Sequence, residues 1–341
     1  MSVSALILPT TLALLALQPI PQPGRAASLS TSPAVAAPAA PSLRTRPAPL
    51  MPDRFRLYSF GVSETSRFDA NGIPQIKPWS NPDTWYYSPT VTAQWGLAAY
   101  VRADDATAIK AADWLVQHQD SNGGFPFFFN HAAPGAWKLK APWYSAISQG
   151  NAISLLVRVW IITGKSLYLD SAKNALLLLQ TPVSHGGLQG TMRELPWFEL
   201  TPDPNWPNHI FNGHVFALLG IHDLAVIGGD AKAAALWRIG ESSLWTNLRF
   251  VYPNGWLLTR PLPPAVPNNT PNPWMVYDLP VNGSNGTSDT PHFVTSYYMR
   301  VHLALLQEMA LRTKGLHRQD YTMLATQLEA SLKAWLASGG S

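Results

Sequence analysis

Hydrophobic and polar positions follow helical spacing in four successive pairs of segments. The first segment of each pair is apolar nearly all round, whereas the second carries apolar residues at i, i+3, i+4 and i+7 with polar residues between them. This pattern predicts an inner helix and an outer helix joined as a hairpin. The predicted pairs are Ala93–Tyr100 with Ala108–Gln119, Ser148–Ile162 with Tyr168–Gln180, Phe211–Val226 with Ala231–Leu248, and Ser296–Thr313 with Asp320–Leu336.

Glycine-rich turns close the first three pairs, each followed by a bulky apolar residue. They recur at intervals of roughly 65 residues, as expected of a repeated unit. The turns are Asn122-Gly123-Gly124-Phe125, His185-Gly186-Gly187-Leu188 and Asn254-Gly255-Trp256. We therefore predict an all-α fold, an α/α toroid of about four stacked hairpins with small irregular or β insertions.

Polar residues head three of the predicted inner helices, where a buried helix should avoid them. They are Gln94, Gln149-Gly150-Asn151 and Asn212-Gly213-His214. Helix capping accounts for any one of these clusters alone. Three clusters in equivalent positions favour a common cavity, to which the helix dipoles add partial positive charge. We predict that Gln149, Asn151, Asn212 and His214 bind an anionic or polyhydroxylated ligand there.

Composition narrows the class of protein. The chain has 341 residues, of which 46% are hydrophobic and 13% charged, so it can build a large core and does not resemble a disordered or coiled-coil protein. A net charge of +4 without a polybasic run gives no support for nucleic-acid binding. The absence of cysteine excludes disulfides and Cys-ligated zinc. Because the histidines are scattered, we expect neither a metal nor another cofactor, and we interpret His131, His185 and His209 as loop or capping residues.

The N-terminal part predicts export. Residues 1–28 are interpreted as a signal peptide or membrane anchor, which places the protein in the periplasm, outside the cell or on a membrane. Residues 29–52 are an Ala/Pro/Ser-rich linker. Residues 53–88 are an N-terminal extension packed on the core, and 89–341 form the helical domain.

Four motifs occur in order along the helical domain. They are SAISQGNAISLLVRVWIITGKSLYLDSAKNAL, FNGHVFALLGIHDL, VYDL, and Tyr298 followed four residues later by His302. The series resembles the C-terminal domain of the D-glucuronyl C5-epimerases of the heparan sulfate/heparosan type, from about Pro89 to Leu336. The resemblance implies an α/α barrel that converts D-glucuronate to L-iduronate within an acidic polysaccharide. The resemblance is also compatible with a homodimer.

The resemblance also implies site residues. The family's catalytic tyrosine in its Tyr-Asp-Leu motif falls on Tyr277, and its second tyrosine falls on Tyr298. The family's Trp-Tyr-Glu-Glu-Tyr-Pro stretch corresponds to residues 197–202, where Glu199 keeps the first glutamate. The second glutamate, thought to act as a base, is replaced by Leu200, and the following tyrosine by Thr201.

Inversion at C5 needs a base, an acid on the opposite face, and groups that hold the substrate carboxylate. We predict Tyr277, Tyr298 and Glu199 as the proton-moving residues. Further substrate contacts are predicted from Arg260, Arg300 and His302, with Trp197 as a platform for a sugar ring. Arg158, in the middle of a helix, is expected to pair with an adjacent helix instead.

Three alternatives remain open at the sequence level. Proton abstraction followed by loss of the C4 substituent would make the protein a uronate lyase. Glu199 paired with Asp203, Asp278 or Asp289 would suit a glycoside hydrolase. The substitutions at Leu200 and Thr201 also allow a catalytically silent glycan-binding protein.

Overall fold

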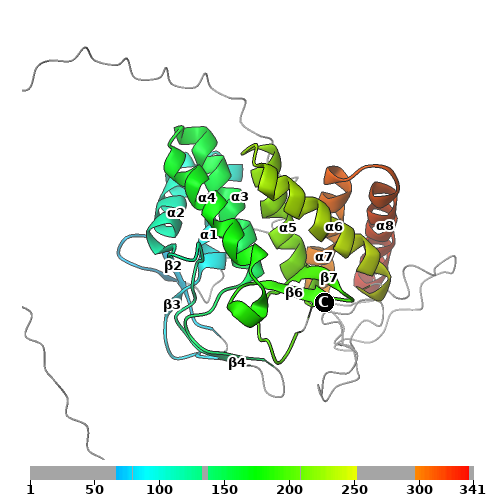
Figure 1. Cartoon of the computed structure of the whole chain (residues 1–341), viewed down its shortest axis with the longest axis horizontal. Helices are drawn as coiled ribbons and strands as arrows, with labels where there is room; N and C mark the ends of the chain where they lie inside the picture. The colour runs from blue at the N-terminus through cyan, green and yellow to red at the C-terminus, as the bar shows by residue number, and fades with distance from the viewer. Residues whose placement is uncertain (1–66, 79, 133–136, 208, 252–295, 338–341) are drawn as a thin grey trace, which may run out of the picture. The chain divides into compact units, whose positions relative to one another are not determined.

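Helices paired in hairpins make up most of the part of the chain that the structure describes. The computed structural model describes residues 67–78, 80–132, 137–207, 209–251 and 296–337, all within the unit Pro41–Ser341. The hairpins are α1 (Pro89–Val101) with α2 (Asp105–His118), α3 (Ala146–Thr163) with α4 (Ser166–Gln180), α5 (Phe211–Val226) with α6 (Ala231–Val251), and α7 (Ser296–Arg312) with α8 (Gly315–Ala337) (Figure 1). Each predicted helix is present, and the all-α prediction is confirmed.

Polar side chains and a glycine fix several helix ends. The Ser88 side chain accepts a hydrogen bond from the Val91 backbone N–H at the start of α1, and Asp104 accepts one from Thr107 at the start of α2. Gly164 ends α3 with a φ of 68°, a conformation that glycine adopts without steric cost. These are the local signals that set the hairpin boundaries.

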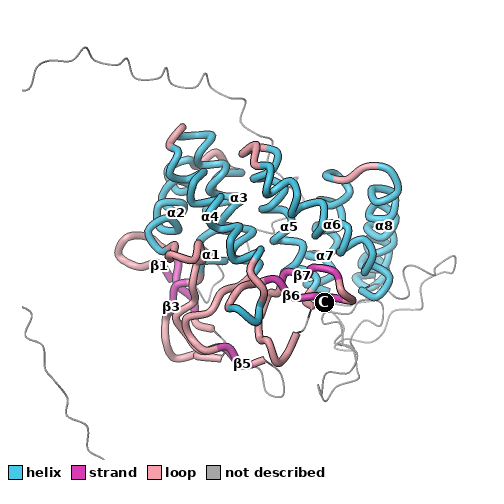
Figure 2. The backbone as a smooth tube through the Cα atoms, in the orientation of Figure 1, coloured by secondary structure: helices cyan, strands magenta, loops and turns pink. Residues whose placement is uncertain are grey.

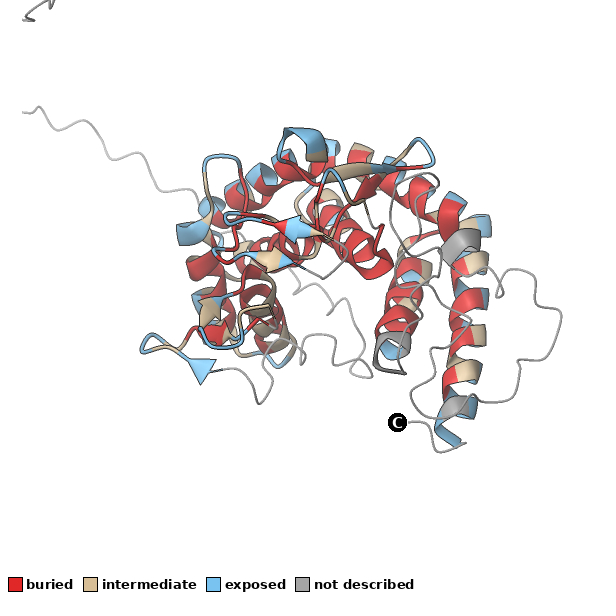
Figure 3. Ribbon diagram, turned by 90° about the horizontal axis from the view of Figure 1, so that it is seen from below, coloured by how far each residue is buried: buried red, intermediate tan, exposed pale blue. Residues whose placement is uncertain are grey.

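The first helices of successive hairpins pack on one another and form the inner layer. α1 contacts α3, α3 contacts α5, and α5 contacts α7. α3 and α5 are buried along most of their length, whereas the second helices keep exposed outer faces (Figure 3). The predicted division into inner and outer helices is confirmed. Closure into a ring stays a prediction, because the extensive contacts among the described helices do not include one between α7 and α1.

Two glycines set how closely α3 and α5 approach. A Cβ built on Gly150 would lie 2.1 Å from the carbonyl oxygen of Phe216, and one built on Gly220 would lie 2.2 Å from the carbonyl oxygen of Gly150. The two helices therefore meet backbone to backbone at this crossing. The polar head of α3 contains a glycine because the neighbouring helix leaves no room for a side chain.

A buried ion pair joins the same two helices further along. Arg158 Nη1 donates to Asp223 Oδ2 at 2.7 Å, and Ser154 donates to the same carboxylate at 2.8 Å. Burial raises the pKa of Asp223, but the charges of Arg158 and Arg312 and the hydrogen bonds from His222 and Arg158 together outweigh burial and keep the pKa below its usual value. On α7, Glu308 pairs with Arg312, which also contributes to the field at Asp223. The expectation that Arg158 pairs with an adjacent helix is confirmed.

The described residues also form three small antiparallel sheets (Figure 2). β1 (Arg67–Phe68), β2 (Pro74–Ile76) and β3 (Tyr86–Tyr87) form one sheet in that order. The other two pair β4 (His131–Ala132) with β5 (Lys138–Leu139), and β6 (Gln189–Met192) with β7 (Leu195–Phe198). β2 contacts α1, so the described part of the N-terminal extension packs against the first hairpin.

Several predicted segments and site residues lie outside the residues that the structure describes. The predicted signal or anchor at 1–28 and the linker at 29–52 are outside them, as are Arg260 and Tyr277. Among the described helices, α3 is long and apolar enough to cross a membrane. It is mostly buried within the fold, as the core helix of a globular protein would be.

Candidate functional site

The stretch 197–201 crosses the N-terminal ends of α3 and α5. The backbone N–H of Ala146, the first residue of α3, donates to the carbonyl of Glu199 at 3.1 Å, and Ser145 Oγ donates to the carbonyl of Leu200 at 2.6 Å. On α5, a Cβ built on Gly213 would lie 2.5 Å from Leu200 Cβ. The structure therefore brings the predicted motif onto the heads of two inner helices.

Glu199 is a buried carboxylate paired with a histidine. Its side chain is 2% exposed, and its Oε2 accepts a hydrogen bond from the backbone N–H of His209 at 3.2 Å. Its Oε1 lies 3.6 Å from His209 Nε2. The facing residue of β6 is Gly190, where a Cβ would come within 2.8 Å of Oε1. A carboxylate and an imidazole are both side chains that can act as a general acid or base.

His209, interpreted from the sequence as a loop or capping residue, lies beside the Glu199 carboxylate. It is buried, its Nε2 lies 2.8 Å from the carbonyl of Thr191, and its backbone φ is +48°. A positive φ at a residue other than glycine costs free energy and is common at functional sites. The only signal in the sequence is its position two residues before the head of α5.

Trp197 and His214 form a buried stack beside this group. Their ring centroids lie 4.0 Å apart at an interplanar angle of 9°, and both side chains are fully buried. His214 Nδ1 accepts from the backbone N–H of Phe198, so its Nε2 carries the proton and donates to the carbonyl of Gly240 at 3.1 Å. Both ring nitrogens thus have protein partners. This geometry favours a structural role for His214, whereas Trp197 Nε1 has no hydrogen-bond partner among the described residues; contact of either residue with substrate stays a prediction.

Gln149 fastens a glycine-rich turn to the core. Its Oε1 accepts from the N–H of Phe125 at 3.1 Å, and its Nε2 donates to the carbonyls of Gly123 and Ala175, both at 3.1 Å. The side chain is fully buried. The amide is occupied on both sides, so a structural role is favoured over the predicted substrate contact.

Asn151 and Asn212 differ from Gln149 because their amides are not fully satisfied. The two residues are 2% and 5% exposed. Among the described residues, Asn151 Nδ2 and Asn212 Oδ1 have no hydrogen-bond partner. A buried polar atom without a partner costs about 1–3 kcal/mol. These two amides therefore retain hydrogen-bonding capacity for a polar ligand or water.

Helix α7 brings a predicted histidine to the head of α5. The His302 ring is fully buried and lies 4.5 Å, centroid to centroid, from the ring of Phe211. Tyr298 is in the first turn of α7, four residues before His302, and its side chain is outside the described part. Arg300 is exposed. The structure thus gathers Trp197, Glu199, Asn212, His214 and His302 around the start of α5 and does not test the two tyrosines.

The buried histidines predict that the protein loses stability in acid. Burial lowers the pKa of His214 and that of His302 to about 3, whereas an unfolded histidine titrates near pH ~6.5. Protons therefore bind the unfolded chain first as the pH falls below about 6.5. We expect the free energy of unfolding to fall by about 1–2 kcal/mol for each histidine between about pH 7 and 5, as measured by urea denaturation. His302→Gln should lose about half of this dependence, and an unchanged slope would contradict the assignment.

Asp203, a predicted partner of Glu199 in a hydrolase, accepts hydrogen bonds from the backbone with both of its oxygens. Its Oδ2 accepts from the N–H of Lys138 at 2.8 Å and its Oδ1 from the N–H of Asn205 at 2.9 Å. Both oxygens thus stabilise loop backbone. In the described ranges, no group of three or more acidic or histidine side chains is placed to hold a metal ion.

Comparisons with known proteins find similarity to one family over the same region. Residues 119–257 match the family model of the D-glucuronyl C5-epimerase C-terminus. A D-glucuronyl C5-epimerase of Caenorhabditis elegans is 34% identical over 116 residues, which are 34% of this chain and 19% of that enzyme. An uncharacterized protein of Methanocaldococcus jannaschii is 28% identical over 124 residues, which are 35% of this chain and 40% of the relative. The similarity covers less than half the length of either relative. The predicted resemblance is confirmed.

Proposed function

We propose that the protein is a uronate C5-epimerase acting on a polysaccharide, because residues 119–257 match the family model of the D-glucuronyl C5-epimerase C-terminus. One observation carries the proposal beyond the similarity itself. The buried Glu199 carboxylate lies beside His209 where the family motif crosses the heads of two inner helices. An acid–base pair at that position is what proton transfer to and from carbon requires.

In the proposed reaction, a base removes the hydrogen from C5 of a glucuronate, and the bonding electrons move into an enolate-like form of the adjacent carboxylate. An acid then delivers a proton to the opposite face of C5, which gives iduronate with no other bond broken. We assign the base to Glu199, with His209 as the residue that positions its carboxylate. Tyr298 and Tyr277 are proposed to deliver the proton from the other face.

The charge that develops on the substrate carboxylate needs donors or cations. Arg300 and Arg260 are proposed for this part because a guanidinium pairs bidentately with a carboxylate. Asn151 and Asn212 have amide capacity left for sugar hydroxyls. The partner is therefore proposed to be an acidic polysaccharide, without a cofactor. Export or membrane anchoring through residues 1–28 and a homodimer also stay proposals.

The test is incubation of a glucuronate-containing polymer with the protein in D₂O. Replacement of the C5 hydrogen by deuterium, followed by NMR and without chain cleavage, is the expected result. Unsaturated products that absorb in the near ultraviolet would show a lyase instead, and new reducing ends without unsaturation would show a hydrolase. Binding without any of these would show a catalytically silent glycan-binding protein. Tyr298→Phe should remove most of the exchange without unfolding the protein.

A further inference from the structure

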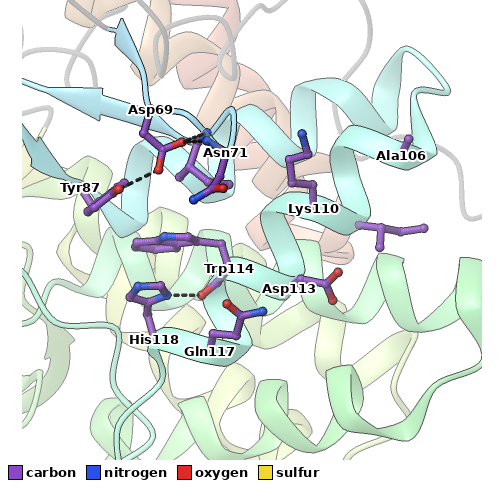
Figure 4. Close-up of a pocket in the computed structure, with 11 residues that line it drawn as sticks. Asp69, Asn71, Tyr87, Ala106, Lys110, Asp113, Trp114, Gln117 and His118 are labelled. Atoms are coloured by element: carbon purple, nitrogen blue, oxygen red, sulfur yellow. Dashed lines mark hydrogen bonds between the residues drawn. The ribbon is translucent and has the colours of Figure 1, made fainter.

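A cavity of about 500 Å³ lies between the N-terminal sheet and the outer helix α2. That volume is within the range of about 300–1,000 Å³ typical of small-molecule sites. None of its lining residues belongs to the candidate site at the head of α5. Figure 4 shows the rings of Tyr87, Trp114 and His118 gathered on one side and the side chains of Lys110 and Asp113 on the other.

The aromatic side of the cavity is held rigidly. Trp114 stacks on His118 with ring centroids 4.0 Å apart, and the Tyr87 ring lies 5.5 Å from Trp114. The Tyr87 hydroxyl donates to Asp69 Oδ2 at 2.7 Å, which fixes the direction of the ring. Asp69 is itself held by the backbone N–H groups of Asn71 and Ile73. Tyr87 keeps 37% of its surface exposed and can meet the apolar face of a sugar ring.

The polar side offers hydrogen-bonding groups that the protein leaves unused. Among the described residues, the Lys110 ammonium, the Gln117 amide and the second oxygen of Asp113 make no hydrogen bond or salt bridge. The first oxygen of Asp113 accepts from the Tyr168 hydroxyl at 2.6 Å. That contact fixes the orientation of the carboxylate, so its second oxygen is available to accept a hydrogen bond from a ligand. His118 Nδ1 lies 2.7 Å from the carbonyl of Trp114, so it carries the proton and leaves Nε2 as an acceptor.

We propose that this cavity binds a pyranose residue of a glycan, separately from the candidate site. The aromatic side would stack on the C–H face of the sugar, while Lys110 donates to ring hydroxyls and Gln117, His118 and Asp113 accept from them. Two carboxylates line the cavity and one ammonium group does, so charge gives no advantage to an acidic sugar. Recognition therefore runs through hydroxyl groups. The site would hold a long substrate without taking part in chemistry.

Binding is tested with a glucuronate-containing tetrasaccharide and with the same tetrasaccharide after its carboxyl groups are reduced to alcohols. The readout is the indole N–H NMR signal of Trp114, assigned with a Trp114→Phe variant. Both probes are expected to shift this signal. A Lys110→Ala/Gln117→Ala double variant should weaken binding of the neutral probe by about tenfold, because two solvent-accessible hydrogen bonds are lost.

Lys173→Ala/Gln180→Ala is the matched control, since both side chains are exposed on the outer helix α4. It should leave the affinity unchanged. Equal affinity of the two double variants, or a Trp114 signal that responds only to the charged probe, would overturn the proposal. Deuterium exchange on a short substrate should be the same in the Lys110/Gln117 double variant as in the wild type. Failure of exchange in every protein would refute the epimerase and leave the binding result intact.

Discussion

Gly150→Ala should destabilise the protein by about 3 kcal/mol or more, although alanine is the better helix former by about 1 kcal/mol. The new Cβ would lie 2.1 Å from the Phe216 carbonyl oxygen and 2.6 Å from Ala217 Cα. Both atoms belong to backbone, so no side chain can rotate away and the two inner helices must separate. The loss would appear as a lower midpoint in urea denaturation followed by circular dichroism.

Gly186→Ala separates this clash from the general cost of replacing a glycine. Gly186 has a φ of +81° and nothing lies within 4 Å of its built Cβ. An alanine there should cost only the strain of the left-handed conformation, about 1–2 kcal/mol. Equal effects of the two substitutions would mean that α3 and α5 are not packed backbone to backbone.

The helical hairpins could be predicted because their signals are local. Spacing of apolar residues and glycine at the turns placed α5 at Phe211–Val226, as observed, and α3 within a few residues of its observed bounds. Whether the hairpins close into a ring depends on contacts between segments far apart in sequence. Residue patterns contain no information on that closure, because an open row of hairpins buries the same faces.

The polar residues at the start of α3 have different roles that the sequence alone does not distinguish. Gln149, Gly150 and Asn151 are adjacent and none has an apolar side chain, so residue patterns predict the same role for all three. In the structure Gln149 bonds to three backbone groups, Gly150 makes room for α5, and Asn151 keeps an unpaired amide nitrogen. Contacts with other segments of the chain determine these roles. The sequence alone does not show which residues will be in contact.

Residues 197–202 resemble the family motif but differ from it at Leu200 and Thr201. The structure shows what Leu200 contacts. Leu200 packs against Gly213 at the head of α5, so an apolar side chain occupies the place where the family has a glutamate. Glu199, one residue earlier, points to His209 instead. The proposed base, Glu199, therefore stands one residue before the position of the family's second glutamate.

Glu199→Gln should slow exchange at C5 in D₂O by about 10²- to 10⁴-fold, the range for loss of a general base. The amide keeps the shape of the side chain and can still accept the N–H bond from His209, so the urea midpoint should change little. Glu194→Gln is the control, because Glu194 is exposed in the turn of the same hairpin, β6 to β7. Exchange within about twofold of the wild type in the Glu199 variant would leave Glu199 a structural carboxylate. Loss of exchange in the Glu199 variant alone would tie the chemistry to this carboxylate, since the two substitutions remove the same charge from neighbouring parts of one loop.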